Sequence, residues 1–205
     1  MIRPIFVAMG IATAMAGLVA AIFLYYAPLP PPVATGTVPP AAALVGRFVA
    51  LPGADFALVA PVDGKGQPAD MGPYRGKALL VNLWATWCGP CIEELPSLGK
   101  LQAALGGADF AVVTIAIDER EPAKIAPFLA EHGAGNLPAL IDLNRTIDQV
   151  AQVSALPASL LVGRDGKARA MLTGDARWHC GKALEAIKAF VADGTVSQDV
   201  LEPCS

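Results

Sequence analysis

The chain has 205 residues, a formal net charge of -3 and four cysteines. This length is sufficient for one well-buried domain with an appendage. The mild acidity, without any cluster of basic residues, argues against a nucleic-acid partner. Aliphatic residues are abundant and aromatic residues make up only 6% of the chain, which favours a compact α/β core with helices on both faces of a sheet.

The N-terminus, residues 1–27, predicts a membrane-spanning helix. Residues 4–27 carry no charge, and this run exceeds both the ~20 apolar residues that span a bilayer and the ~7–15 of a signal-peptide core. Arg3 precedes the run, so we expect the start to remain inside and the rest of the chain to be exported. A cleaved signal peptide is the alternative, which small residues at 17–21 allow.

Residues 28–43 predict a linker, and residues 44–205 the folded domain. The linker is rich in proline and small uncharged residues, a composition that favours extended polyproline conformation. We therefore expect a single-pass protein of the inner (cytoplasmic) membrane, anchored in the lipid bilayer through residues 4–27, with its C-terminal domain in the periplasm.

Hydrophobic patterns and turn residues in the folded domain predict alternating strands and helices. Pro96 should kink the first helix, Gly133 and Gly194 suit helix ends, and an Asp-Gly turn at 165–166 suits a hairpin. The result is an α/β domain with a mixed sheet. The expected strands are 55–59, 78–83, 110–117, 137–141, 159–162 and 168–172, and the expected helices are 92–105, 122–132, 145–152 and 182–192.

Cys88 and Cys91 form a Cys-Gly-Pro-Cys motif between the strand 78–83 and the helix 92–105. In this context the motif indicates thiol–disulfide chemistry. The thiolate is the reactive form, and the positive end of a helix favours it over the thiol, whose free pKa is about 8.5. We expect Cys88 to be the exposed nucleophile and Cys91, one turn further in, to resolve the mixed disulfide.

A structural zinc site and a purely structural disulfide are the competing interpretations of the motif. Zinc needs four regularly spaced ligands, but Cys180, Cys204, His132 and His179 show no paired spacing near the motif. A purely structural disulfide is disfavoured because Gly-Pro between the cysteines makes an open turn at a helix start and does not link distant elements.

Three segments carry a family resemblance: Val-Asn-Leu-Trp-Ala-Thr-Trp-Cys-Gly-Pro-Cys at 81–91 with the acidic residue at 94, Ala-Leu-Pro-Ala-Ser at 155–159, and the lead-in at 63–77. They resemble the thioredoxin superfamily and, within it, the membrane-tethered TlpA/ResA-like thiol–disulfide oxidoreductases. The resemblance covers about residues 44–192. It implies a thioredoxin-like three-layer fold with a mixed central sheet, in which residues 121–141 are a helix–strand insert.

The resemblance assigns a proton-transfer role to Glu94. A partly desolvated carboxylate near two thiols would have a raised pKa and could move a proton between Cys91 and solvent. The alternative is a solvated surface carboxylate. Asn82 stands where plain thioredoxins have a buried acidic residue, so the chain lacks that proton acceptor.

The resemblance also implies a docking surface for partner peptides. Pro157 is predicted to follow a cis peptide bond that turns the Leu156 backbone toward Cys88. Ala155 and Ser159 stand where this family usually has Gly and Thr, so the loop differs from the family pattern at two positions. Trp84 and Trp178 are expected to be packing residues. The predicted substrate-binding residues are Trp87, Gly89, Pro90, Leu156 and Pro157.

Cys180 and Cys204 lie outside the motif. Cysteines in an oxidising compartment tend to pair, and the tail is long enough to return to the start of the last helix. A structural disulfide between the two is favoured. Two free thiols, or a second redox centre that exchanges with Cys88, are the alternatives.

The predicted function is therefore that of an enzyme, a thiol–disulfide oxidoreductase that works mostly as a reductase. A membrane electron donor would re-reduce the dithiol, and no cofactor or metal beyond the Cys88–Cys91 pair is required. The resemblance implies partner proteins of cytochrome c maturation or copper-site assembly. The alternative is a copper-chaperone-like module that binds Cu(I) through Cys88, Cys91 and a histidine such as His179, although such modules have three residues between their cysteines. A peroxiredoxin is disfavoured because the chain lacks the Thr-x-x-Cys setting.

Overall fold

The computed structural model describes residues 47–51, 53–56, 59–118, 121–198 and 200. The predicted membrane helix and linker, residues 1–43, lie outside these described residues. Among the helices of the described residues, none has the length and apolar character needed to cross a membrane.

A mixed six-stranded sheet forms the centre of the domain. Its strand order is β1-β6-β5-β2-β3-β4, with β2 parallel to β3 and β3 parallel to β4, whereas the other neighbours are antiparallel. Every residue of the neighbouring strands β2 and β3 is buried, as expected where helices or loops cover both faces. The strands are β1 (Phe48–Ala50), β2 (Ala78–Trp84), β3 (Phe110–Ala116), β4 (Leu140–Ile141), β5 (Ala158–Val162) and β6 (Ala168–Thr173).

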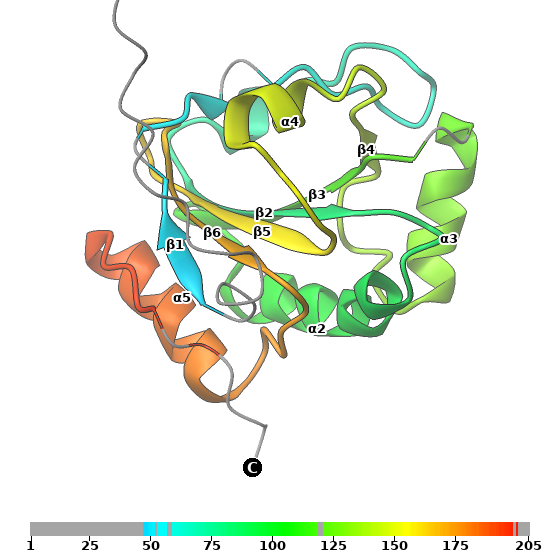
Figure 1. Cartoon of the computed structure of the whole chain (residues 1–205). Coiled ribbons are helices and arrows are strands. Elements are labelled where there is room, and N and C mark those ends of the chain that lie inside the picture. The colour runs from blue at the N-terminus through cyan, green and yellow to red at the C-terminus, as the bar shows by residue number, and fades with distance from the viewer. Residues whose placement is uncertain (1–46, 52, 57–58, 119–120, 199, 201–205) are drawn as a thin grey trace, which may run out of the picture. The chain divides into compact units, whose positions relative to one another are not determined.

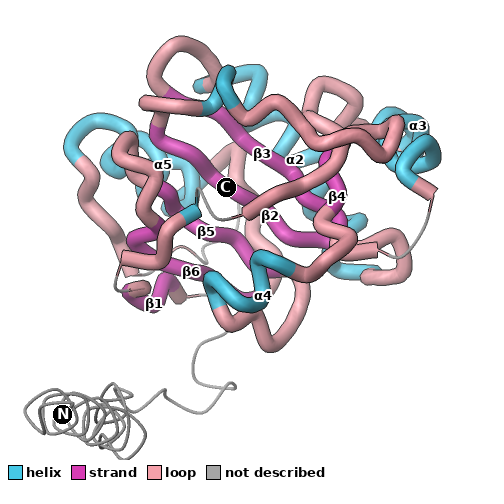
Figure 2. Tube along the Cα trace, turned by 90° about the horizontal axis from the view of Figure 1, so that it is seen from above, coloured by secondary structure: helices cyan, strands magenta, loops and turns pink. Residues whose placement is uncertain are grey.

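In the described part of the chain, four α-helices pack around this sheet. They are α2 (Gly89–Leu105), α3 (Ile125–Glu131), α4 (Thr146–Ala151) and α5 (Gly181–Asp193). Helices α2 and α5 lie on one face and α4 on the other, so the domain has three layers (Figure 1). Figure 2 shows α3 beside the β4 edge of the sheet. Short 3-10 turns cover Gly72–Tyr74 and Pro122–Lys124.

The predicted order of elements is largely confirmed. The motif lies between β2 and α2, and the β5–β6 hairpin and the closing helix follow as expected. Gly194 ends α5 with a positive φ of 82°, the left-handed conformation that glycine adopts without a Cβ penalty. Helix α2 continues without interruption through Pro96. The helix–strand insert is also present, as α3 and β4 between β3 and α4.

The predicted strand at 55–59 is wrong at residues 55, 56 and 59; residues 57 and 58 lie outside the described part of the chain. Asp55 forms only an isolated bridge with Lys167, and the first described strand is β1, which pairs with β6. Gly53, with a φ of 68°, interrupts the extended backbone between β1 and this bridge. A positive φ is incompatible with a regular strand, so β1 ends before Gly53 and Asp55 pairs only through a separate bridge.

The predicted strand at 137–141 is shortened to two residues. The Leu137 N–H donates to the Ala134 carbonyl and the Pro138 carbonyl accepts from Thr114 Oγ1 at 2.6 Å. Proline has no N–H to give to a ladder, so regular pairing begins only at Leu140. The Asn136 amide then ties this connection to α2, donating to the Gly99 carbonyl at 2.9 Å.

Candidate active site

The Cys88–Cys91 pair is a disulfide at the start of α2, with an S–S distance of 1.99 Å. Cys88 is the N-cap residue of the helix, and its Sγ accepts from the Cys91 N–H at 3.3 Å. Cys88 is 6% exposed, whereas Cys91 is 0% exposed. Both residues are therefore buried, contrary to the expectation of an exposed Cys88. Of the two, only Cys88 keeps some accessible surface, and the helix N-terminus favours negative charge there.

The loop between β2 and Cys88 is fixed by a buried carboxylate. Asp118, 4% exposed, follows β3 and accepts from the Thr86 N–H at 2.9 Å and also from the Thr86 hydroxyl. The Cys88 N–H donates to the Ala85 carbonyl at 3.1 Å. Hydrogen bonds accepted by a carboxylate are among the stronger ones in proteins, so Asp118 holds the backbone that leads into Cys88.

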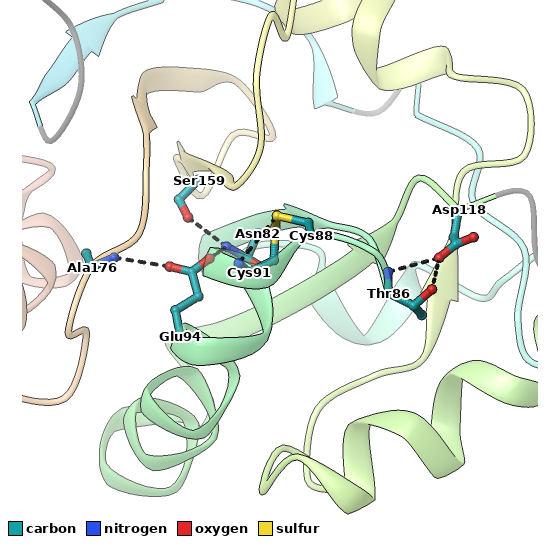
Figure 3. The surroundings of a disulfide bond; sticks show 8 residues. All are labelled: Asn82, Thr86, Cys88, Cys91, Glu94, Asp118, Ser159 and Ala176. Carbon is teal, nitrogen blue, oxygen red and sulfur yellow. Dashed lines mark hydrogen bonds between the residues drawn. A yellow bond between two sulfur atoms is a disulfide. The ribbon is translucent and has the colours of Figure 1, made fainter. Parts of the chain in front are cut away.

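Glu94 lies in the interior, one helical turn beyond Cys91. It is 3% exposed. Its Oε1 accepts from Asn82 Nδ2 at 2.6 Å, and its Oε2 accepts from the Ala176 N–H at 3.2 Å and from Trp178 Nε1 at 3.0 Å. Figure 3 shows Glu94 with Asn82 and Ala176 beside the disulfide. The alternative of a solvated surface carboxylate is therefore wrong.

Burial raises the pKa of Glu94 from 4.5 to about 7. Loss of hydration penalises the charged form and is the largest cause, while the hydrogen bonds from Asn82, Trp178 and Ala176 oppose it and the negative charge of Asp175 adds to it. A carboxyl group with a pKa near neutrality can both accept and release a proton under physiological conditions.

Asn82 links two strands beneath the disulfide. It is paired with Ser159 in the β2–β5 register, and its Nδ2 donates to Ser159 Oγ at 3.0 Å as well as to Glu94. Both Asn82 and Ser159 are 0% exposed. The buried polar layer therefore runs from β5 through β2 to α2.

A surface groove opens beside Cys88. Trp87, 64% exposed, stands on its border, and the peptide bond between Leu156 and Pro157 is cis as predicted. The groove brings together three of the predicted substrate-binding residues, Trp87, Pro90 and Leu156. Gly89 is exposed and Pro157 is buried, and neither is among the residues that line it. The lining residues are Trp87, Cys88, Pro90, Ile117, Arg145, Val153, Ser154, Ala155 and Leu156.

Several members of this site escaped the sequence analysis. Trp178 was expected only to pack; it is fully buried against Phe48 and also donates to Glu94. Asp118 carried one usable signal, a carboxylate directly after an apolar strand. Arg145, the charged residue among the described lining of the groove, has no comparable sequence signal.

The remaining cysteine and histidine candidates of the described residues make other contacts than those of this cluster. Cys180 is disulfide-bonded, but Cys204 lies outside the described residues, so their pairing stays a prediction. His179 Nδ1 lies 3.1 Å from Ser97 Oγ. The described part of the chain holds no group of three His, Cys, Asp or Glu side chains arranged for a metal ion.

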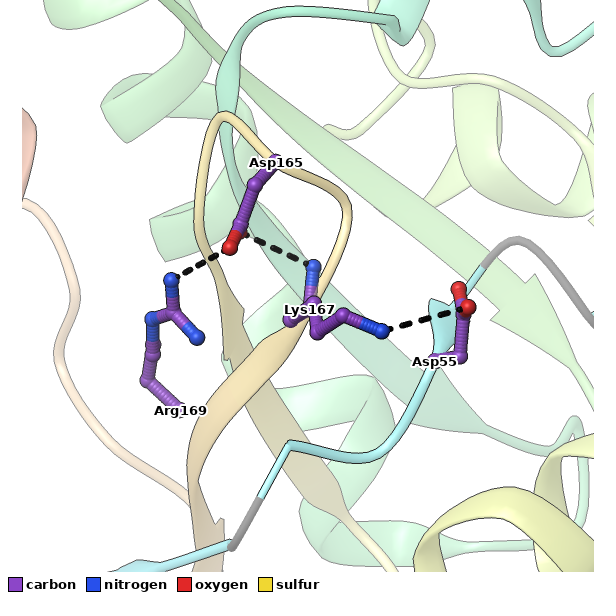
Figure 4. Close-up of polar contacts among 4 residues, drawn as sticks. All are labelled: Asp55, Asp165, Lys167 and Arg169. Atoms are coloured by element: carbon purple, nitrogen blue, oxygen red, sulfur yellow. Dashed lines mark hydrogen bonds and ion pairs between the residues drawn. The ribbon is translucent and has the colours of Figure 1, made fainter.

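Charged side chains gather at the β5–β6 turn (Figure 4). Asp165 accepts from the Lys167 N–H at 3.2 Å and pairs with Arg169 at 2.6 Å, while Lys167 pairs with Asp55 at 3.4 Å. These side chains are more than 40% exposed, and exposed ion pairs contribute little to stability. Their arrangement is that of an ordinary hairpin turn.

The Redoxin family profile matches residues 49–187, and the chain belongs to this family. The solved thioredoxin domain of a thiol-disulfide oxidoreductase from Bacteroides vulgatus has a TM-score of 0.50 and 21% identity, covering 72% of this chain and 99% of that one. The fold is therefore thioredoxin-like, as predicted.

Two relatives carry the name thiol-disulfide oxidoreductase ResA. The protein of Geobacillus kaustophilus is 30% identical over 120 residues, 58% of this chain and 66% of its own length. The protein of Bacillus subtilis is 28% identical over 112 residues, 55% of this chain and 62% of its own length. The chain thus spans slightly less than two thirds of the relatives that it matches.

Proposed function

We propose that this protein is a thiol–disulfide oxidoreductase that reduces disulfides in partner proteins. The observation that carries the proposal is the asymmetry of the Cys88–Cys91 disulfide. Cys88 lies at a helix N-terminus and lines a surface groove, whereas Cys91 is completely buried and lies one helical turn before the buried carboxyl group of Glu94. A stapling disulfide needs neither a groove nor a titratable neighbour.

The reaction starts from the reduced pair. The Cys88 thiolate attacks one sulfur of a partner disulfide, forms a mixed disulfide and releases the other partner sulfur as a thiolate. Cys91 then loses its proton and attacks Cys88 Sγ, which expels the second partner thiolate. Two electrons pass to the partner, and the Cys88–Cys91 disulfide is formed.

Glu94 is the group that accepts the Cys91 proton in this scheme. Its pKa of about 7 lies between the pKa of a solvent-exposed carboxyl group and that of a free thiol. Proton transfer between Cys91 and Glu94 is therefore reversible. Its two oxygens are held by Asn82, Trp178 and the Ala176 backbone. These contacts fix the carboxyl group in place without depriving it of all its lone pairs.

The groove supports docking of an extended peptide next to Cys88. Trp87 offers a broad exposed apolar surface, and the segment before the cis bond lines the opposite side. Exposed aromatic side chains are frequent anchors of protein interfaces. In this proposal Trp87, Gly89, Pro90, Leu156 and Pro157 form the docking region.

We further propose that residues 1–27 anchor the protein in the inner membrane, that residues 28–43 act as a linker, and that the domain works in the periplasm. A membrane electron donor would then re-reduce the disulfide. The ResA relatives, whose name is thiol-disulfide oxidoreductase, support the redox role. Partners in cytochrome c maturation or in copper-site assembly are the proposed substrates.

Trapping with Cys91→Ala tests the exchange chemistry. Without the resolving thiol, mixed disulfides on Cys88 should accumulate on contact with disulfide-containing partners, and reductant should release them. The matched control Cys88→Ala retains the buried thiol and should trap nothing. Equal trapping by both variants, or none by either, would contradict the proposal.

The reduction potential tests the direction. A value near that of thioredoxin, about -270 mV, supports a reductant, whereas a value near about -120 mV would mean an oxidant. The measurement uses equilibration with glutathione or dithiothreitol and a gel shift of alkylated thiols.

A further inference from the structure

Two buried side-chain polar atoms of the described residues have no hydrogen-bond partner, Asn82 Oδ1 and Trp84 Nε1. Only Asn82 Oδ1 is an acceptor. A buried acceptor without a donor loses its hydration without compensation, and such atoms are rare enough in native proteins to need an explanation. This one lies in the polar layer beneath the disulfide.

The orientation of the Asn82 amide follows from its other contacts. Nδ2 donates to Glu94 Oε1 at 2.6 Å and to Ser159 Oγ at 3.0 Å. Rotating the amide by half a turn would break both of these donated bonds and, whenever Glu94 is ionised, would place Oδ1 against its carboxylate in an unfavourable acceptor–acceptor contact. The two donated bonds therefore hold Oδ1 in the position where it has no donor.

Cys91 lies next to the same layer, beside Asn82 (Figure 3). It is completely buried and precedes Glu94 by three residues, so the two side chains share a face of α2. Figure 3 draws the Asn82 amide between the disulfide and the Glu94 carboxyl group. As half of a disulfide, the Cys91 sulfur has no hydrogen to donate.

Reduction of the disulfide adds a hydrogen-bond donor to this polar layer. A dithiol electron donor supplies two electrons and two protons, the S–S bond breaks, and the donor becomes a disulfide. Cys91 then carries an S–H group in a position closed to solvent. An S–H group is a weak donor, and the unpaired acceptor of the layer is Asn82 Oδ1.

We propose that Asn82 is a positioning residue for the reduced enzyme, whose Oδ1 accepts a hydrogen bond from the Cys91 thiol once the disulfide opens. The inference rests on the proposed redox function and deepens it. The bond favours the reduced form over the disulfide. It also keeps Cys91 protonated and in place until Cys88 has formed a mixed disulfide with a partner.

Infrared spectroscopy of the full chain tests this bond directly. The S–H stretching band of Cys91, identified in the reduced Cys88→Ala variant by subtracting the Cys88→Ala/Cys91→Ala spectrum, should lie below that of a thiol in a solvent without acceptors. Adding Asn82→Ala should move the band upward. Ser159→Ala, which removes a partner of Nδ2 and leaves Oδ1 intact, should not move it.

The thiol–disulfide equilibrium gives a second readout. Asn82→Ala should lower the equilibrium constant for reduction about fivefold, equivalent to a potential about 20 mV more negative, while Ser159→Ala should change it less than twofold. The proposal is overturned if the Cys91 band of the reduced Cys88→Ala protein, with Asn82 intact, lies at the free-thiol position. It is also overturned if Asn82→Ala and Ser159→Ala shift the band or the equilibrium constant equally. The first of these measurements uses a protein with Asn82 intact, so it does not depend on whether an Asn82 variant folds. The infrared result does not depend on partner exchange, so it fails separately from the proposed function.

Discussion

Glu94→Gln should remove a pH dependence of stability that the buried carboxyl group creates. In the native disulfide form the pKa of Glu94 is raised from 4.5 to about 7, so between these values the folded chain retains a proton that the unfolded chain has lost. The unfolding free energy therefore falls as pH rises through this window. Each pH unit between the two pKa values is worth about 1.4 kcal/mol, which gives a loss of about 3 kcal/mol.

The sign of this effect distinguishes Glu94 from the surface carboxylates. A group whose folded pKa is raised contributes most stability below its unfolded pKa, and the contribution disappears as pH passes the folded pKa. Asp165 and Asp193 have lowered pKa values because nearby backbone and side-chain groups donate hydrogen bonds to them. Their contributions run the opposite way, and both side chains are at the surface.

The assay is urea denaturation of the oxidised unaltered chain and of Glu94→Gln at pH 4, 5.5, 7 and 8.5. Gln cannot accept all three hydrogen bonds that Glu94 accepts, so a constant offset between the two chains is expected. The informative quantity is the difference in unfolding free energy, which should change by about 3 kcal/mol across the window in favour of Gln at high pH. A difference that stays constant from pH 4 to pH 8.5 would refute the reasoning.

Three further changes test the surroundings of the site. Trp178→Phe keeps an apolar ring but deletes the donor to the Glu94 carboxyl, so the Glu94 pKa should rise above about 7; a side-chain carbon NMR titration measures it, and an unchanged midpoint would contradict the assignment. Asp118→Ala leaves the partly buried Thr86 donors without this acceptor and should cost roughly 1–3 kcal/mol of unfolding free energy in urea, whereas the exposed control Asp109→Ala should cost less than about 1 kcal/mol. Gly194→Ala must place a Cβ at a φ of 82° and should lower the unfolding free energy by roughly 1 kcal/mol; no loss of stability would mean that the backbone there is not held.

Local patterns were enough to predict most of the elements. The apolar runs at β2 and β3 are buried along their entire length, and glycine ends α5 where the pattern indicated. The failures occurred where one residue overrode the pattern. Gly53 breaks the extended chain before Asp55, and Pro138 delays the start of β4.

The Cys-Gly-Pro-Cys motif could be recognised from sequence because its chemistry is local. Two thiols three positions apart at a strand–helix junction are close enough to exchange, whatever surrounds them. The cis bond before Pro157 is confirmed, but only the family resemblance predicted it. Neither spacing nor composition distinguishes it from a trans bond.

The surroundings that tune the motif were decided by tertiary structure. Glu94 could equally have faced solvent by its helix position; its burial follows from α2 packing on β2 and from donors 12 and 84 residues away along the chain. Asp118 and Asn82 acquire their partners in the same way. The sequence by itself determined the reactive pair and its place between a strand and a helix. Only the folded domain decided which sulfur is sealed and which carboxyl group lies beside it, because burial and the choice of partner depend on contacts between segments far apart in the chain.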